Sequence, residues 1–204
     1  MSSSPSYLDP VVLPLIVGET VLDVACGYGR WCHLIQSNYW EAGLTAPPLV
    51  DGFDAFEPNV EHCRRAGCYR KVWQQTLPSL LEGSWDTVLA CEVIEHLPEH
   101  EVTAVVDLLE HAARRRIIFT TPNFPAFRGG VDTQLGHNSF DAHLSYVPRS
   151  FFRSRGYRLR GAGWGNPTNP LVRITSRMRL APSLHSVPRA FPALGESVVA
   201  VKDF

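Results

Sequence analysis

Three residues that could hold a metal ion or move a proton fall close together, at Glu92, Glu95 and His96. Their spacing of i, i+3 and i+4 places all three side chains on one face if the turn is helical. Two carboxylates packed together repel each other unless a positive charge lies between them. A divalent cation meets that need, and three ligands from one turn leave positions for a further ligand and for substrate oxygens.

The same turn also fits a site without metal. His96 would then act as a general base, and Glu92 would line an adjoining pocket. The histidines at His100, His111 and His137 are assigned no role, because nothing near them in the sequence suggests one. The residue types alone therefore leave both kinds of chemistry open.

A second candidate site is the glycine turn that begins at Asp23. Residues 20–22 read as a buried strand, and residues 23–29 follow as an acid-tipped, glycine-rich turn that opens a helix near Arg30. Such a turn lets the backbone approach a nucleotide-like ligand closely. The Asp23 carboxylate repels an anionic pyrophosphate, whereas it attracts the amine and sulfonium of S-adenosylmethionine. Since Cys32 also replaces the third glycine of a dinucleotide fingerprint, the turn favours S-adenosylmethionine as the cofactor.

Strand-like and helix-like runs alternate along the chain, which predicts an α/β fold with helices on both faces of a sheet. The sequence predicts strands at 20–25, 49–54, 70–74, 86–91, 116–121, 157–162 and 197–202. It predicts helices at 30–37, 58–66, 99–113 and 148–155. The stretches at about 122–147 and 163–195 have little periodicity and are expected to be irregular segments on the acceptor side. A length of 204 residues favours a single domain, residues 1–204.

The composition predicts a soluble protein of the cytoplasm. Hydrophobic residues make up 45% and charged residues 19% of the chain, and no apolar stretch is long enough to cross a bilayer. The first residues lack the basic and apolar parts of a signal peptide. Five cysteines without a Cys-x-x-Cys pair indicate reduced thiols rather than a disulfide framework.

With Asp54, Asp86 and the sequence Glu92-Val93-Ile94-Glu95-His96 added to the glycine turn, the chain resembles class I S-adenosylmethionine-dependent methyltransferases. The resemblance covers about residues 15–163 and a final strand near 197–202. It implies a Rossmann-like, doubly wound sheet of seven strands, mostly parallel, with the last strand antiparallel. It also implies an enzyme that binds its cofactor across the carboxyl ends of the first strands.

By this resemblance, Asp23, Gly27 and Gly29 match the motif that holds the methionine end of the cofactor. Ala25 belongs to the same motif, at a position that is usually glycine. Glu92 is expected to line the cofactor pocket.

The resemblance assigns the rest of the cofactor to residues after the second and third strands. Asp54 matches the acid that accepts hydrogen bonds from both ribose hydroxyls, although a helix N-cap is its alternative role and Glu57 is a rival. After the third strand the family often supplies an aspartate to the adenine amino group. Here Gln75 could accept that hydrogen bond through its amide oxygen.

A narrower resemblance concerns the metal. The small-RNA 3′-terminal 2′-O-methyltransferases share the Glu-x-x-Glu-His turn, a Thr-Pro-Asn like that at residues 121–123, and a later histidine like His143. The ubiquinone-pathway O-methyltransferases share the turn. In both groups the turn is associated with a divalent metal near the acceptor hydroxyl. The resemblance therefore implies magnesium or manganese bound by Glu92, Glu95, His96 and His143.

Several functions fit these observations. The leading hypothesis is metal-assisted O-methylation of a small molecule with adjacent hydroxyls. The alternatives are 2′-O-methylation of an RNA 3′ end, methylation of N, C or O with His96 as base and no metal, and a fold retained as a cofactor-binding or interaction module. Residues 1–144 carry a net charge of −9 and residues 145–204 a net charge of +8. The RNA hypothesis uses the basic end of the chain, namely Arg153, Arg155, Arg158, Arg160, Arg173, Arg177 and Arg179.

Overall fold

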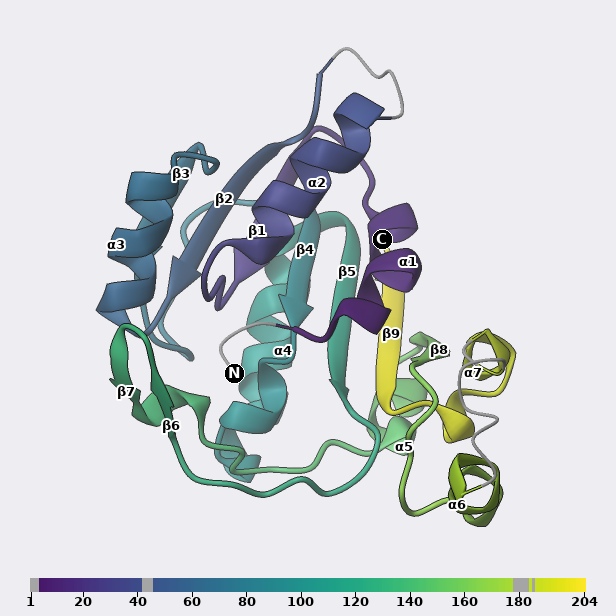
Figure 1. Cartoon of the computed structure of the whole chain (residues 1–204). Coiled ribbons are helices and arrows are strands. Elements are labelled where there is room, and N and C mark those ends of the chain that lie inside the picture. The colour runs from purple at the N-terminus through teal and green to yellow at the C-terminus, as the bar shows by residue number, and fades with distance from the viewer. Residues whose placement is uncertain (1–3, 42–45, 178–183, 185) are drawn as a thin grey trace.

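The computed structural model describes residues 4–41, 46–177, 184 and 186–204, and in this part of the chain helices pack on both faces of a central sheet (Figure 1). The sheet has seven strands in the order β3-β2-β1-β4-β5-β9-β8. Neighbouring strands from β3 to β5 run parallel, whereas β9 runs antiparallel to both β5 and β8. The prediction of a Rossmann-like, mostly parallel sheet with an antiparallel last strand is confirmed.

The strands lie close to their predicted positions. Their bounds are β1 Thr20–Val24, β2 Leu49–Asp54, β3 Lys71–Gln74, β4 Trp85–Cys91, β5 Ala113–Pro122, β8 Arg158–Ala162 and β9 Ser197–Asp203. Parallel strands that are buried on both faces read as apolar runs, which makes them easy to find in a sequence. Strand β5 starts three residues before its predicted start, because the polar residues 114–116 interrupt the apolar pattern there.

The predicted helices are also present, with bounds α2 Arg30–Glu41, α3 Glu57–Ala66, α4 Glu99–Ala112 and α5 Arg149–Ser154. The stretches predicted to be irregular need correction. The first contains a hairpin and a short turn, β6 Val131–Thr133, β7 Gly136–Asn138 and η4 Ser139–Asp141, and the second contains α6 Pro170–Arg177, α7 Val187–Ala190 and η6 Pro192–Leu194. Elements this short do not show a hydrophobic period in the sequence. The same reason explains the unpredicted N-terminal turns η1 Ser6–Leu8, α1 Asp9–Val12 and η2 Leu13–Leu15.

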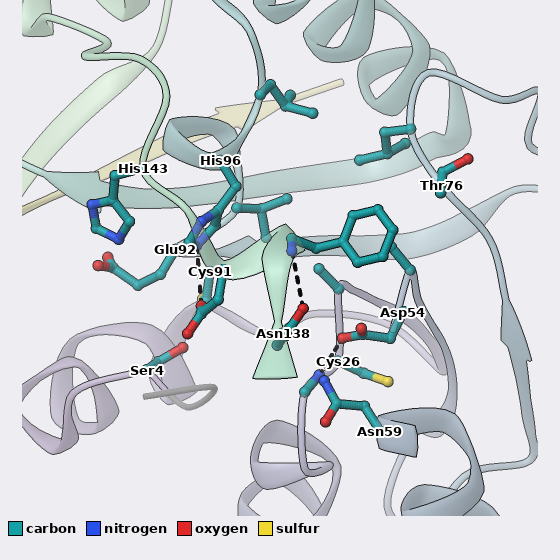
Figure 2. A pocket seen from close by; sticks show the side chains of 18 of the residues that line it. Ser4, Cys26, Asp54, Asn59, Thr76, Cys91, Glu92, His96, Asn138 and His143 are labelled. Atoms are coloured by element: carbon teal, nitrogen blue, oxygen red, sulfur yellow. Dashed lines mark hydrogen bonds and ion pairs between the residues drawn. The ribbon is translucent and has the colours of Figure 1, made fainter. Parts of the chain in front are cut away.

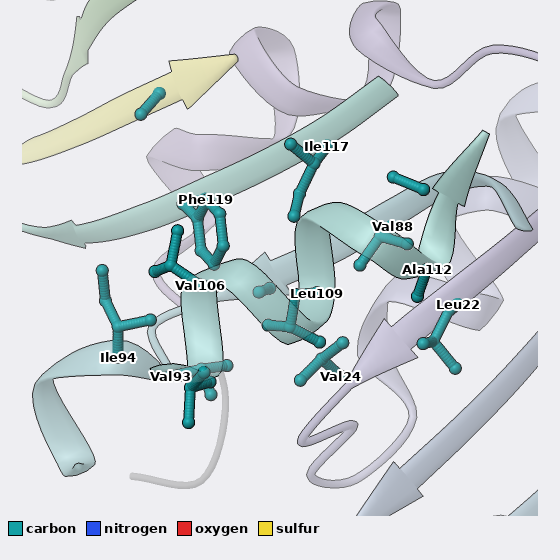
Figure 3. Packing of buried hydrophobic residues seen from close by; sticks show 14 of the residues in the cluster. Leu22, Val24, Val88, Val93, Ile94, Val106, Leu109, Ala112, Ile117 and Phe119 are labelled. Atoms are coloured by element: carbon teal, nitrogen blue, oxygen red, sulfur yellow. The ribbon is translucent and has the colours of Figure 1, made fainter. Parts of the chain in front are cut away.

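Two apolar layers hold the helices on the sheet. Figure 3 shows α4 packed through Val106 and Leu109 against Leu22 and Val24 of β1 and against Phe119 of β5. On the other face, the N-terminal turns and α2 pack on alternate residues of the same strands, because successive side chains of a strand point to opposite faces. These layers fix the carboxyl ends of β1, β2 and β4 along one edge of the sheet.

No helix in the described part of the chain is both long and apolar enough to cross a bilayer. The five cysteines carry free thiols, and those of Cys26 and Cys63 approach within 4.0 Å.

Candidate active site

A cavity of about 680 Å³ opens at the carboxyl ends of β1, β2 and β4. The order of the strands reverses between β1 and β4, and open α/β sheets bind ligands at such a point. Figure 2 shows His96 and His143 at one end of this cavity and Asp54 and Asn59 at the other. We call the first the histidine end, formed by Glu92, His96 and His143 with Glu95 buried behind the lining, and the second the turn end, formed by residues 25–27 with Asp54 and Asn59.

The turn end is built on backbone in the left-handed region. The φ angles of Ala25, Gly27 and Gly29 are +51°, +55° and +80°, a conformation that favours glycine. Ala25 and Gly27 line the cavity, as predicted for cofactor-binding residues. Gly29 lies away from the lining, and a Cβ atom there would come within 3.2 Å of Tyr69. Gly29 therefore shapes the turn, whereas Ala25 and Gly27 face the cavity.

Asp54 fastens the glycine turn to the end of β2. Its Oδ2 atom accepts a hydrogen bond from the Gly27 N–H at 2.8 Å, and its Oδ1 atom accepts one from the Phe56 N–H at 2.9 Å. The side chain is buried, yet it lines the cavity, and burial raises its pKa. The alternative role of Asp54 as a helix N-cap is wrong, because the N-cap of α3 is Phe56 and no side chain caps that helix. The rival Glu57 instead pairs with Arg64 at 3.2 Å and lies outside the lining.

Asp23 lies in the packed interior and not in the cavity wall. It is 1% exposed, and its Oδ2 atom accepts a hydrogen bond from the Tyr69 hydroxyl at 2.6 Å. Burial raises its pKa to about 7. The structure therefore places Asp23 behind the turn and outside the cavity lining, which corrects its predicted contact with the cofactor.

Three polar residues complete the cofactor side of the cavity. Gln75 lines it as predicted, but its amide oxygen already accepts a hydrogen bond from the Trp73 indole N–H at 2.7 Å. Thr76 and Asn59 also line it, and the sequence analysis missed both. Asn59 is 1% exposed and its Oδ1 atom has no hydrogen-bond partner, so this oxygen is free to accept one. In the sequence Asn59 resembles any polar residue in the first turn of a surface helix.

The turn at the histidine end differs from the predicted helical turn. A 3₁₀ turn, η3, spans Ile94–His96, and Glu92 precedes it with φ at +56°. Glu92 therefore does not share a helical face with Glu95 and His96, which corrects that premise. Its Oε1 atom accepts a hydrogen bond from the Thr120 hydroxyl at 2.9 Å. Burial raises the pKa of Glu92 to about 7, and the side chain lines the cavity.

The structure brings together three of the four residues implied as metal ligands. Potential ligand atoms of Glu95, His96 and His143 lie within 4.8 Å of one another, and Glu92 lies outside this group. Glu95 is 2% exposed, and neither of its carboxylate oxygens makes a hydrogen bond of acceptable geometry. Burial and the nearby charge of Glu92 raise its pKa well above the usual range, although the Thr121 hydroxyl lies close enough to lower it in part. The buried Nδ1 atom of His143 has no partner either.

Residues that follow the β6–β7 hairpin contact the imidazole of His96. The Nδ1 atom of His96 lies 3.0 Å from the Ala142 carbonyl oxygen, so Nδ1 carries the proton and Nε2 carries the lone pair. Asp141 Oδ1 lies 3.8 Å from this Nε2 atom and 3.6 Å from Nη2 of Arg128. Burial lowers the pKa of His96, and burial followed by the His96 charge lowers the pKa of His143 to about 4. Both imidazoles are therefore neutral at neutral pH, as ligands and bases must be.

Asp141 and Arg128 were missed in the sequence, since they lie in a stretch without periodicity. Of the arginines considered for RNA binding, Arg155 pairs with Glu110 at 3.3 Å, and Arg158 pairs with Asp203 at 2.6 Å. None of that set whose side chains are described lines the cavity. Arg179 and the side chain of Arg177 lie outside the described residues.

The comparisons with known proteins agree with this geometry. A family model described as "Methyltransferase domain" matches residues 6–159. The fold is similar to magnesium protoporphyrin IX methyltransferase from Synechocystis PCC 6803, solved with bound S-adenosylhomocysteine, with a TM-score of 0.58 and 18% identity over 96% of this chain and 81% of that one. It is also similar to an S-adenosylmethionine-dependent methyltransferase from Mesorhizobium loti, with a TM-score of 0.56 and 17% identity over 98% of both chains.

One curated relative is similar in sequence. It is a ubiquinone biosynthesis O-methyltransferase from Methylococcus capsulatus, 29% identical over 87 residues. The match spans 41% of this chain and 35% of the relative, so most of the relative lies outside it.

Proposed function

Because this chain belongs to the methyltransferase domain family, it is an S-adenosylmethionine-dependent methyltransferase, and we propose that it methylates a hydroxyl of a small molecule with adjacent hydroxyls, assisted by a divalent cation. The observation that carries the proposal is the buried, unpaired carboxylate of Glu95, which lies behind the cavity lining and beside the two neutral imidazoles that line the cavity. The curated relative, named an O-methyltransferase, supports oxygen as the acceptor atom.

The turn end fits the cofactor. S-adenosylmethionine supplies a methyl group on a cationic sulfonium, which makes transfer possible without covalent help from the protein. The left-handed backbone at Ala25 and Gly27 leaves the cavity wall open on that side, and Asp54 holds it there. The unpartnered Asn59 oxygen offers an acceptor for a ligand N–H or O–H group. The carboxyl group of Asp54 at this end, with that of Glu92 at the histidine end, gives the cavity lining acidic groups that suit a cationic ligand.

The histidine end fits a divalent ion. A buried carboxylate without a partner costs several kcal/mol if it is ionised, so Glu95 needs either a proton or a cation beside it. Two imidazoles and one carboxylate suit manganese or another transition ion at least as well as magnesium. Such an ion, when bound by Glu95, His96 and His143, lowers the pKa of a hydroxyl that contacts it.

Residues of the chain itself supply the base and position the reacting groups. Glu92 lines the cavity at the histidine end, and with a pKa of about 7 its carboxylate can take a proton from an acceptor hydroxyl. The Ala142 carbonyl oxygen orients the ring of His96, and residues of the β6–β7 hairpin such as Val131 and Asn138 line the cavity. The protein therefore contributes position, a base and a shaped site.

The test is methyl transfer from labelled S-adenosylmethionine to a panel of diols, before and after exhaustive treatment with a chelator. We expect chelation to abolish transfer and added Mn²⁺ to restore it. Full activity after chelation would contradict the metal, while leaving the methyltransferase assignment intact.

A second candidate, transfer without metal, is favoured by one observation. The Ala142 carbonyl oxygen lies 3.0 Å from Nδ1 of His96 and holds the tautomer whose Nε2 lone pair can act as a general base, with Asp141 3.8 Å away to stabilise the imidazolium that would form. In that case His96→Ala would stop transfer, whereas His143→Ala would leave it nearly unchanged. With a metal site, both variants lose activity.

A further inference from the structure

Thr120, near the end of β5, makes three hydrogen bonds with Glu92, the residue that follows β4. The Glu92 N–H donates to the Thr120 carbonyl oxygen at 2.9 Å and to its Oγ1 atom at 3.0 Å. The same hydroxyl donates to Oε1 of Glu92 at 2.9 Å. Thr120 is fully buried, so water does not compete for these bonds. One residue therefore holds both the backbone and the carboxyl group of Glu92.

The backbone of Glu92 needs this support. Its φ of +56° lies in the left-handed region, which is unfavourable for a residue with a Cβ atom. Residues in this region persist where their surroundings fix the conformation, and they are found most often at functional sites. In this conformation Glu92 stands outside the group formed by Glu95, His96 and His143, and it lines the cavity.

A second hydroxyl reaches Glu92 from the start of β9. Burial raises the pKa of Glu92, and the hydroxyls of Thr120 and Ser197 both act to lower it, because each donates to the charged form. The Oγ atom of Ser197 lies 3.0 Å from the hydroxyl oxygen of Tyr7. Hydroxyls from two neighbouring strands therefore meet at the carboxyl group of Glu92.

The end of β5 also fixes the position of Ser197. The Asn123 N–H donates to the Glu196 carbonyl oxygen at 2.8 Å, and the Asn123 side-chain amide donates to the Gly195 carbonyl oxygen at 2.9 Å. Asn123 is itself buried, and these bonds hold the chain just before β9. The stretch 120–123 therefore organises both supports of Glu92, one directly and one through the neighbouring strand.

From these contacts we propose that Thr120 is a positioning residue for methyl transfer: its hydroxyl holds Glu92 in the left-handed conformation that presents the carboxyl group to the cavity. This inference rests on the proposed function, in which Glu92 takes the proton of the acceptor hydroxyl. It gives a task to a residue that lies outside the cavity lining. A purely structural role would instead satisfy buried polar atoms and affect stability alone.

The first experiment tests the position of Glu92 and needs no acceptor. Thr120→Val removes the hydroxyl and keeps the branched shape, whereas Thr120→Ser keeps the hydroxyl. In crystals of the full chain grown with S-adenosylhomocysteine, we expect the Glu92 carboxyl group to leave the cavity wall in Thr120→Val and to keep its place in Thr120→Ser. An unchanged Glu92 in Thr120→Val would overturn the inference.

The second experiment measures transfer from labelled S-adenosylmethionine to the diol of the panel that is methylated fastest. Thr120→Val should lower kcat by about tenfold or more, because a displaced base transfers the proton less efficiently, while the KM for S-adenosylmethionine stays within about threefold. Thr120→Ser should recover most of the lost kcat. Urea unfolding of the same variants shows whether the fold is intact.

Thr87→Val is the matched control. Thr87 is also a fully buried strand residue, and its hydroxyl donates to the Val17 carbonyl oxygen at 2.7 Å and accepts from the Val17 N–H at 3.0 Å. It lies outside the cavity lining. Loss of this hydroxyl should lower the free energy of unfolding and leave kcat unchanged.

A double-mutant cycle tests whether Thr120 acts through Glu92. Glu92→Gln should lower kcat by itself, and adding Thr120→Val to it should cost little more, because two residues in contact do not act independently. Equal losses from Thr120→Val in both backgrounds would overturn the inference, since Thr120 would then act by another route.

The remaining outcomes separate this inference from the function on which it rests. If Glu92→Gln loses kcat and Thr120→Val keeps it, the inference is overturned and the proposed function stands. If Glu92→Gln keeps full kcat, the base assigned in the proposed function is wrong, and this inference is overturned with it. If no diol is methylated, the proposed function fails, and the crystals of Thr120→Val decide the positioning of Glu92.

Discussion

The two ends of the cavity differ in how their buried polar atoms are satisfied. At the turn end both carboxylate oxygens of Asp54 accept backbone hydrogen bonds and Asp23 behind it accepts one from Tyr69, while the amide oxygen of Asn59 has no partner. At the histidine end both oxygens of Glu95 and the Nδ1 atom of His143 have no partner. Buried polar groups in folded proteins are nearly always hydrogen-bonded.

This difference teaches that the two halves of the site reach their working state in different ways. The turn end is already organised by the chain, so the cofactor meets a preformed surface. In the proposed function, the histidine end would be completed by a divalent cation, which has the charge and the ligand preference for a carboxylate and two imidazoles. A variant at one end of the cavity is expected to leave ligand binding at the other end unchanged.

The largest effect is expected from the histidine end. Glu95→Gln removes the charge that would hold a cation and keeps the shape of the side chain, so kcat should fall by about 100-fold or more. Binding of S-adenosylhomocysteine, measured by isothermal titration, should stay within about threefold, a difference well below the 1.4 kcal/mol that a tenfold change requires. Glu99→Gln, an exposed change on α4, is the control and should keep full activity. Equal activity in the two variants would remove Glu95 from the chemistry.

The free energy of unfolding should depend on pH because of the buried acids near the turn end. Burial raises the pKa of Asp23 to about 7 in the folded protein, whereas in the unfolded chain it titrates near about 4. At a pH between these two pKa values, Asp23 is protonated in the folded protein and ionised in the unfolded chain. The contribution of Asp23 to the free energy of unfolding is therefore complete below about pH 4, and it is lost as the pH rises to about 7.

Urea unfolding without ligands measures this loss. Asp23 alone contributes a slope of about 1.4 kcal/mol per pH unit within that window. Asp23→Asn cannot titrate and should flatten the dependence, leaving the part due to Glu92, whose pKa is also raised to about 7. The same slope in both proteins would show that Asp23 is ionised in the folded state.

A smaller effect is expected from Asp54→Ala. Loss of the bonds to Gly27 and Phe56 frees the glycine turn, so the Kd for S-adenosylhomocysteine should rise about tenfold, as expected when charge-assisted hydrogen bonds are removed. Mn²⁺ binding at the other end should be unchanged. Glu57→Ala is the matched control, and a larger loss in that variant would transfer the ribose role to Glu57.

The smallest effect concerns the strain in the turn. Ala25 has φ at +51°, and a non-glycine residue in this region costs about 1 kcal/mol or more. Ala25→Gly should therefore raise the free energy of unfolding by up to about 1 kcal/mol, with cofactor affinity little changed. A less stable variant in urea unfolding would show that the alanine methyl group makes a compensating contact.

The sequence predicted the sheet well and the acceptor side poorly, for physical reasons. Apolar runs such as β4 and the spacing of α4 are consequences of burial, so their positions follow from the residues themselves. The hairpin β6–β7 and η4 carry no such pattern, although they bring Asp141 and His143 to the cavity. Their positions depend on long-range backbone bonds, such as the one between the Leu144 N–H and the Glu95 carbonyl oxygen.

The turn after β4 shows a second limit. Spacing alone placed Glu92, Glu95 and His96 on one helical face, but the positive φ of Glu92 turns it out of that group. A single left-handed residue is enough to redirect a side chain, and its occurrence at a non-glycine position cannot be read from a local pattern.

A crystal structure grown with S-adenosylhomocysteine and Mn²⁺ tests the central claim most directly. The account predicts an anomalous peak coordinated by Glu95, His96 and His143, with the cofactor product against Ala25, Gly27 and Asp54. An empty histidine end in crystals that hold the cofactor product, together with full activity after chelation, would contradict it.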